Sequence, residues 1–185
     1  MKNTKQQSFF NQKINKFFGG SLLKSNPKTK RPISTTQAIH LVLKSQHAVG
    51  KHSMLHSYNT KKIESVILSQ AKFWGIKIYH YVNVGNHLHL VIKLNNRRSF
   101  NPFIRAVTGL IARHVLNAER GSAKEVQFWV ARPFTRIISW GRDYLNINKY
   151  MQKNKGQAKE RCKEHFAAWG FDITNTGSIL NLNTC

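Results

Sequence analysis

The chain has 185 residues, of which 30 are Lys or Arg and only seven are Asp or Glu, so its formal net charge is +23. That length fits one compact domain with tails, and a hydrophobic content of 41% can build its core, which argues against a wholly disordered chain. The shortage of acidic residues counts against enzymes that cage metal ions with carboxylates, and the uncompensated positive charge indicates a polyanion as the partner.

The cysteines and the apolar residues indicate the compartment. Cys162 and Cys185 are too few for a secreted disulfide framework. No apolar run approaches the roughly 18 residues that a membrane-spanning helix needs, and the scattered apolar residues near the N-terminus form no signal-peptide core. We therefore expect a soluble, cytoplasmic protein.

Composition divides the chain into three parts. Residues 1–32 are basic, contain no acidic residue and include the pair Gly19-Gly20, which predicts a flexible N-terminal arm. Residues 170–185 are polar and rich in Asn and Thr, which predicts a C-terminal tail. Residues 33–169 carry the periodic patterns expected of the folded domain.

The folded part begins with a strand, a helix and a hairpin. Residues 37–44 (QAIHLVLK) form a short run rich in branched side chains, which predicts a strand. Residues 61–74 place apolar side chains on one face at helical spacing, and Gly75 is a natural stop. The strand-like runs 76–84 and 87–94 are separated only by Gly-Asn, a dipeptide that supplies the positive φ of a tight hairpin turn.

A helix, a strand and a long final helix follow. Apolar residues recur at helical spacing over 101–119, residues 133–140 (PFTRIISW) read as a strand, and 143–169 as the last helix. The order β-α-β-β-α-β is typical of an α+β, ferredoxin-like fold, the split βαβ layout shared with RNA-recognition modules. We therefore expect an antiparallel sheet of that type with an additional C-terminal helix.

A His-x-His pair lies on the second strand of the hairpin. His87 and His89 are two residues apart, so both imidazoles project from one face, and a two-residue turn would set Val82 opposite His89. The opposite face carries Leu88, Leu90, Ile92 and Leu94. Two neutral nitrogen ligands side by side suit a shared metal ion, although a lone His-x-His pair is often purely structural. The other histidines, His40 among them, show no comparable arrangement and are treated as structural or solvent-facing.

The final helix carries a polar stripe beside its apolar one. The polar stripe consists of Tyr150, Asn154, Gln157 and Arg161. Taken alone, Tyr150 fits an ordinary boundary tyrosine with a half-buried ring. Together with the His pair, a tyrosine and an amide one turn apart suggest a chemistry. Two imidazoles and an amide oxygen bind a divalent ion that polarises a phosphodiester, and the tyrosine hydroxyl is the nucleophile.

Three short motifs occur along the chain: GNHLHL at 85–90, RPFTR at 132–136 and KYMQKN at 149–154. Together they resemble the single-tyrosine HUH transposases, specifically the REP-associated tyrosine transposases and their IS200-like relatives. The resemblance covers essentially the whole folded core and keeps the order of the motifs. Two positions depart from it, because Gly85 and Lys155 stand where many relatives have proline.

The resemblance implies DNA transposition. His87, His89 and Asn154 would hold Mg²⁺ or Mn²⁺ at the scissile phosphate, and Tyr150 would attack it, leaving a 5′-phosphotyrosine and a free 3′-hydroxyl. The 3′-hydroxyl of a second strand would then resolve the covalent bond. Relatives act on single-stranded DNA, often beside imperfect hairpins or inverted repeats, and some work as homodimers, so we expect a DNA partner of this kind.

Basic and polar residues around the motifs are candidates for DNA contact: Arg97, Arg98, Arg132, Arg136, Lys149, Lys153, Gln157 and Arg161. Because few acidic residues lie nearby, we expect a positive surface that leads to the site and DNA binding that weakens steeply with salt. Phe128, Trp129 and Trp140 could stack on unpaired bases, although a core position is the favoured interpretation for at least Trp140.

Two other functions fit parts of the pattern. A non-catalytic or domesticated protein that binds single-stranded nucleic acid could use the same fold, but RNA-recognition modules read bases with aromatic residues where this strand has His87 and His89. A metallohydrolase that activates water needs a general base, and no Asp or Glu lies near either motif. Strand transfer by Tyr150 is therefore the leading hypothesis, with the non-catalytic binder as the alternative.

Overall fold

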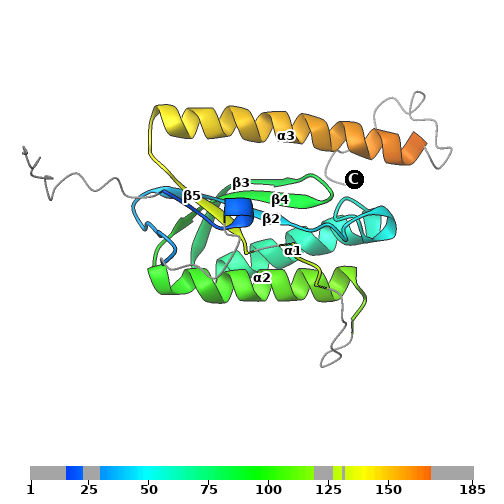
Figure 1. Cartoon of the computed structure of the whole chain (residues 1–185), viewed down its shortest axis with the longest axis horizontal. Helices are drawn as coiled ribbons and strands as arrows, with labels where there is room; N and C mark the ends of the chain where they lie inside the picture. Colours follow the sequence, from blue (N-terminus) through cyan, green and yellow to red (C-terminus); the bar gives the residue numbers. More distant parts are fainter. Residues whose placement is uncertain (1–15, 23–29, 119–126, 131, 168–185) are drawn as a thin grey trace, which may run out of the picture.

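The computed structural model describes residues 16–22, 30–118, 127–130 and 132–167, with backbone alone from 161 onward. Five strands form one antiparallel sheet in the order β1-β5-β2-β4-β3. The strands are β1 (Phe17–Phe18), β2 (Ala38–Lys44), β3 (Ile76–Asn83), β4 (His87–Leu94) and β5 (Phe134–Ile138). The helices are α1 (Ser57–Phe73), α2 (Phe100–Val115) and α3 (Arg142–Ala167), with short 3-10 helices η2 (Gly20–Leu22), η3 (Gly50–His52) and η4 (Arg97–Ser99). Figure 1 shows α1 and α2 on one face of the sheet and α3 along the other.

This architecture confirms the predicted ferredoxin-like fold. The order β5-β2-β4-β3 is the one that a split βαβ unit produces, and α3 is the additional C-terminal helix. The sequence does not predict β1, which comes from the expected N-terminal arm and pairs with Arg136 and Thr135 of β5. Residues 1–15 and 23–29 of that arm, and the expected tail 170–185, lie outside the described residues. No helix in the described part of the chain is long and apolar enough to span a membrane.

The sheet separates two hydrophobic clusters of different size. On the side of α1 and α2, alternate residues of β4 are fully buried, as the predicted alternation requires. These residues are Leu88, Leu90, Ile92 and Leu94. On the other side, Val82 and Val91 pack with Ile147 and Met151 of α3 in a smaller cluster. This smaller cluster holds α3 against the face of β4 that also carries the two motif histidines.

The β3–β4 hairpin has the predicted register. Val82 lies opposite His89, and the backbone N–H of Val84 donates to the His87 carbonyl (3.0 Å). Gly85 has a φ of +93°, a left-handed conformation that glycine adopts without strain. Proline is fixed at a φ of about −65°, so this turn cannot take the proline that many relatives have.

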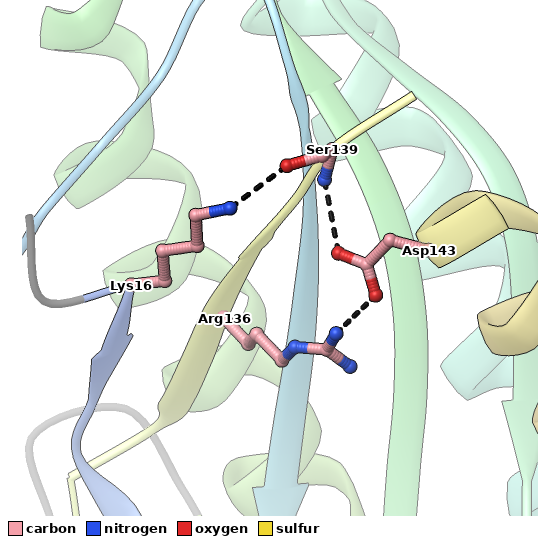
Figure 2. A network of polar contacts seen from close by, with 4 residues as sticks. All are labelled: Lys16, Arg136, Ser139 and Asp143. Atoms are coloured by element: carbon pink, nitrogen blue, oxygen red, sulfur yellow. Dashed lines mark hydrogen bonds and ion pairs between the residues drawn. The ribbon is translucent and has the colours of Figure 1, made fainter. Parts of the chain in front are cut away.

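A polar network joins the start of α3 to β5, as Figure 2 shows. Asp143, in the first turn of α3, accepts a hydrogen bond from the backbone N–H of Ser139 (3.1 Å) and forms an ion pair with Arg136. The Lys16 ammonium, immediately before β1, donates to the Ser139 hydroxyl (2.8 Å). A carboxylate in the first turn also stabilises the positive end of the helix dipole. The network therefore fixes the position of the start of α3 relative to the sheet, and so helps to set the position of Tyr150 on that helix.

Candidate active site

A cleft of about 510 Å³ lies on the α3 side of the sheet, beside the start of β4. Its lining includes His40 and Lys44 from β2, His87 and His89 from β4, and Tyr150 from α3. Residues of η2 and of the segment before β5 complete its rim. Elements that are far apart in sequence therefore meet in one cavity of a single chain.

The two motif histidines lie side by side in this cleft. Because they are two residues apart on β4, their rings project from one face, and the ring centroids are 4.7 Å apart. His87 Nδ1 lies 2.6 Å from the side-chain oxygen of Asn86, which can only accept, so Nδ1 carries the proton and Nε2 the lone pair. His89 is 3% exposed, and its Nε2 has no hydrogen-bond partner among the described residues.

Burial keeps two of the cleft imidazoles neutral. Loss of solvation, with smaller contributions from His40 and His87, lowers the pKa of His89 to about 3. Loss of solvation, with a smaller contribution from the positive charge of Arg136, lowers the pKa of His40 to about 4. Both rings are therefore neutral near pH 7, the state in which an imidazole nitrogen binds a metal ion.

Tyr150 reaches the histidines from α3. Its ring centroid lies 5.5 Å from that of His89 and 5.9 Å from that of His40, with interplanar angles of 85° and 73°. The side chain is 44% exposed, so a substrate can reach it. Tyr144, six residues earlier on α3, instead packs against Trp140 and does not line the cleft. The geometry therefore favours Tyr150 as the tyrosine that meets a substrate bound at the histidines.

Asn154 follows Tyr150 by one turn of α3, is 5% exposed and is not among the residues that line the cleft. Its side-chain nitrogen donates to the Tyr150 carbonyl (2.8 Å), which leaves the amide oxygen as the end that can bind a cation. Within the described ranges, no group of three or more His, Cys, Asp or Glu side chains is placed to hold a metal ion. A cation site built on the two motif histidines would therefore need a ligand of another type, such as an amide oxygen.

His40 is a site residue that the sequence analysis missed. It is treated there as structural or solvent-facing, but it is 6% exposed, lines the cleft and lies within hydrogen-bond distance of His89. The predicted fold could have indicated His40, because the first and third strands of a ferredoxin-like sheet are neighbours. Side chains on one face of these two strands therefore lie close together. The observed register places Val42 opposite His89 and His40 opposite Val91. Because alternate residues of a strand face the same side, Lys44 lies on the same face of β2 as His40 and also lines the cleft.

Some of the predicted DNA-contacting residues surround the cleft. Arg132 lines it. Of the predicted residues on α3, Lys149, Lys153 and Gln157 have exposed side chains. Arg161 also belongs to α3, but its side chain lies outside the described part of the structure. Because α3 also carries Tyr150, these residues can extend a basic surface away from the cleft.

The other predicted DNA contacts are either paired inside the protein or far from the cleft. Arg136 is half-buried and paired with Asp143, which gives it a structural role inside the protein. Arg97 and Arg98 are exposed but follow the far end of β4 from His87. At about 3.3 Å per strand residue, they lie more than about 20 Å from that histidine. The structure therefore does not bring Arg97 and Arg98 to the candidate site, whereas Arg136 lies opposite the cleft residue His40 but is held by Asp143.

The three aromatic residues singled out in the sequence have different environments. Phe128 is 3% exposed and belongs to the core, so it cannot stack on a base in this conformation. Trp129 packs against the same core and donates its indole N–H to the Thr108 carbonyl (3.0 Å). The interpretation of Trp140 as a core aromatic is wrong, because its side chain is 45% exposed. Its indole N–H donates to the Thr36 carbonyl (2.9 Å), which holds the ring at the surface.

The chain is similar to known proteins in sequence and in structure. Residues 34–154 match the family described as "Transposase IS200 like". The fold superposes on a REP-associated tyrosine transposase bound to a REP hairpin with a TM-score of 0.53 and 14% identity, over 68% of this chain and 70% of that chain. A protein of Deinococcus radiodurans R1, provisionally named a transposase, aligns with a TM-score of 0.42 and 13% identity over 71% of this chain and 98% of that chain. No curated protein matches the chain.

Proposed function

The chain belongs to the family of IS200-like transposases, which are enzymes of DNA transposition, and we propose that it cleaves single-stranded DNA and transfers the cut end through a covalent bond to Tyr150. The observation that carries this proposal is the meeting of Tyr150 and His89 in one cleft, with ring centroids 5.5 Å apart. Both residues come from one chain, so this pairing does not require a homodimer.

The proposed ligands of the divalent cation, Mg²⁺ or Mn²⁺, are His87, His89 and Asn154. An amide oxygen is a ligand type that suits both ions, and the two imidazoles add nitrogen ligands. The buried His89 Nε2 has no partner within the described protein, and a bound cation would satisfy it. When bound, the cation supplies Lewis-acid stabilisation of the negative charge on a phosphate oxygen.

In the proposed reaction the Tyr150 hydroxyl attacks the scissile phosphorus. A bond forms between the phenol oxygen and phosphorus, and the bond between phosphorus and the 3′ oxygen breaks. The phenol proton passes to solvent, and the leaving oxygen takes up a proton to become a 3′-hydroxyl. The resulting 5′-phosphotyrosine is still a phosphodiester, so the 3′-hydroxyl of a second strand can displace Tyr150 without an external energy source.

The proposed substrate is single-stranded DNA beside a hairpin or inverted repeat. A net charge of +23 favours a nucleic-acid partner, and Lys44 and Arg132 place positive charge in the cleft itself. The exposed Lys149 and Lys153 continue it along α3. The similarity to the fold of a transposase that is bound to a REP hairpin supports hairpin DNA as the substrate class.

The direct test is to look for a covalent adduct. The full chain is incubated with Mn²⁺ and single-stranded oligonucleotides that carry candidate hairpins, and adducts are detected by denaturing gel and peptide mass spectrometry. We expect an adduct on Tyr150 in the wild type and none in Tyr150→Phe, although the variant still binds the oligonucleotide. Tyr144→Phe, on the same helix but outside the cleft, is the matched control and should retain the adduct.

Two outcomes would contradict the proposal. An adduct that persists in Tyr150→Phe would exclude Tyr150 as the nucleophile. Oligonucleotide binding without an adduct in the wild type, across the set of candidate hairpins and with Mg²⁺ as well as Mn²⁺, would favour the non-catalytic binder.

A further inference from the structure

A third imidazole lies directly behind the proposed ligand pair. His40 Nε2 is 3.1 Å from His89 Nδ1, and the two rings are nearly parallel, with an interplanar angle of 14° and centroids 5.3 Å apart. The His40 ring also meets the edge of Tyr150, at 5.9 Å between centroids, and that of Phe134, at 6.3 Å. His40 therefore contacts both the buried member of the His pair and the proposed nucleophile.

A hydrogen bond between two neutral imidazoles can be formed in two ways. In one, His89 carries its proton on Nδ1 and donates it to His40, which leaves the lone pair on His89 Nε2. In the other, His40 donates to His89 Nδ1, so His89 carries its proton on Nε2. The second arrangement buries an N–H group for which the described residues offer no acceptor, at a free-energy cost. The first arrangement leaves a lone pair on His89 Nε2 that a cation can accept.

We propose that His40 is a positioning residue that accepts the Nδ1–H of His89, and thereby holds His89 in the tautomer and ring orientation that present Nε2 to the cation. This inference rests on the cation site of the proposed function. Metal-bound histidines commonly donate their second ring N–H to an acceptor that fixes the tautomer, and loss of that acceptor commonly weakens metal binding.

His87 has a corresponding partner of different chemistry. Its Nδ1 lies 2.6 Å from the Asn86 side-chain oxygen, which can act only as an acceptor. Each histidine of the pair is therefore contacted through Nδ1 by a separate side chain, Asn86 from the turn and His40 from β2. The two contacts leave the same ring nitrogen, Nε2, for the cation in both cases.

The first experiment measures Mn²⁺ binding to the purified full chain by electron paramagnetic resonance of the free ion. His40→Phe keeps an aromatic ring but removes the acceptor, and we expect Mn²⁺ affinity to fall by about 10- to 100-fold. His40→Gln restores an acceptor oxygen and should recover most of the affinity. His80→Phe, a substitution on β3 outside the cleft, is the matched control and should bind as the wild type does. Wild-type Mn²⁺ affinity in His40→Phe would overturn the proposal.

The second experiment reads the tautomer directly and does not depend on any variant. Two-bond ¹H–¹⁵N correlation spectra of the metal-free wild type distinguish a proton on His89 Nδ1 from one on Nε2. We expect the Nδ1–H tautomer, with a mixture of the two in His40→Phe. An Nε2–H tautomer in a wild type that binds Mn²⁺ would overturn the role of His40 alone. A wild type that binds no Mn²⁺ would instead defeat the cation site of the proposed function, and this inference with it.

Discussion

Arg136 of β5 and Asp143 of α3 form an ion pair two helical turns before Tyr150, at the point where the chain leaves the sheet and enters the helix. Asp143 also accepts the backbone N–H of Ser139, so one carboxylate joins the strand end to the helix start (Figure 2). Because α3 carries Tyr150 while the sheet carries the histidines, this junction helps to set the position of the proposed nucleophile relative to the proposed ligands.

Removal of the Asp143 carboxylate should therefore affect stability and activity together. We expect Asp143→Ala to lower the free energy of unfolding by about 1–2 kcal/mol through loss of the Ser139 contact and of the helix-dipole interaction. Both side chains of the ion pair are partly exposed, so the pair itself adds little. Urea denaturation measures the change, and adduct yield should fall as well. Glu160→Ala, at an exposed position on α3, is the control; equal stability of the two variants would contradict this account.

Arg31 attaches the N-terminal region to the sheet. One guanidinium nitrogen donates to the Pro133 carbonyl and to the Thr135 hydroxyl, both at 2.7 Å, and the group lies over the ring of Phe18, 4.4 Å from its centroid. Loss of solvation, with the positive charge of Arg132 as a smaller cause, lowers the pKa of Arg31 to about 10, so the group stays charged at neutral pH.

Substitution of Arg31 should therefore destabilise the edge of the sheet. Arg31→Met keeps an unbranched apolar stem and removes the donors, and we expect a loss of about 1.5–3 kcal/mol in the free energy of unfolding. Urea denaturation followed by tryptophan fluorescence provides the measurement. The exposed neighbour Lys30 provides the control, and a Lys30→Met variant that is equally destabilised would show that the Arg31 contacts are not the cause.

The parts of the fold that the sequence predicts are those governed by local periodicity. The Gly-Asn turn sets the hairpin register, which places Val82 opposite His89 as expected. The same alternation separates the buried leucines of β4 from its histidines. The polar stripe of the last helix places Tyr150 and Asn154 one turn apart, which is also a local relation.

The parts that the sequence does not predict depend on contacts between distant segments. β1 has only two residues, Phe17–Phe18, too few for any periodic signal, and it exists only because the edge of β5 accepts it. The contact between His40 and His89 joins residues 49 positions apart and requires the strand order to be known. From the sequence alone Arg136 is predicted to be available for DNA contact. Its pairing with Asp143 depends on how β5 and α3 are oriented, which the sequence does not show.

Acidification should destabilise the metal-free protein. The pKa values of His89 and His40 are about 3 and about 4 in the folded chain, against about 6.5 for an unperturbed histidine. Between these values the unfolded chain binds more protons than the folded chain, so the free energy of unfolding falls as the pH decreases from about 6.5 toward about 4. Urea denaturation in EDTA at pH 7 and pH 5 should show this loss. The loss should be smaller in His40→Phe, and an unchanged loss would exclude His40 as a source of it.

The salt dependence of DNA binding should distinguish the basic residues near the cleft from those at the far end of the sheet. If Arg132 contacts a phosphate of the bound strand, Arg132→Gln should weaken binding and reduce the slope of log K against log salt by about 0.7, the value for one phosphate contact in single-stranded DNA. Arg97→Gln removes the same charge at an exposed position beyond β4 and serves as the matched comparison.

Fluorescence anisotropy with a labelled hairpin oligonucleotide, measured from low to physiological salt, gives both slopes. We expect the wild-type slope to be steep, because the chain carries a net charge of +23. We expect Arg97→Gln to retain the wild-type slope. To reach Arg97, the bound DNA would have to extend more than about 20 Å from His87 along the sheet. Equal reductions in the two variants would show that the DNA path continues to that end of the molecule, and a flat wild-type slope would show that phosphate contacts do not drive binding.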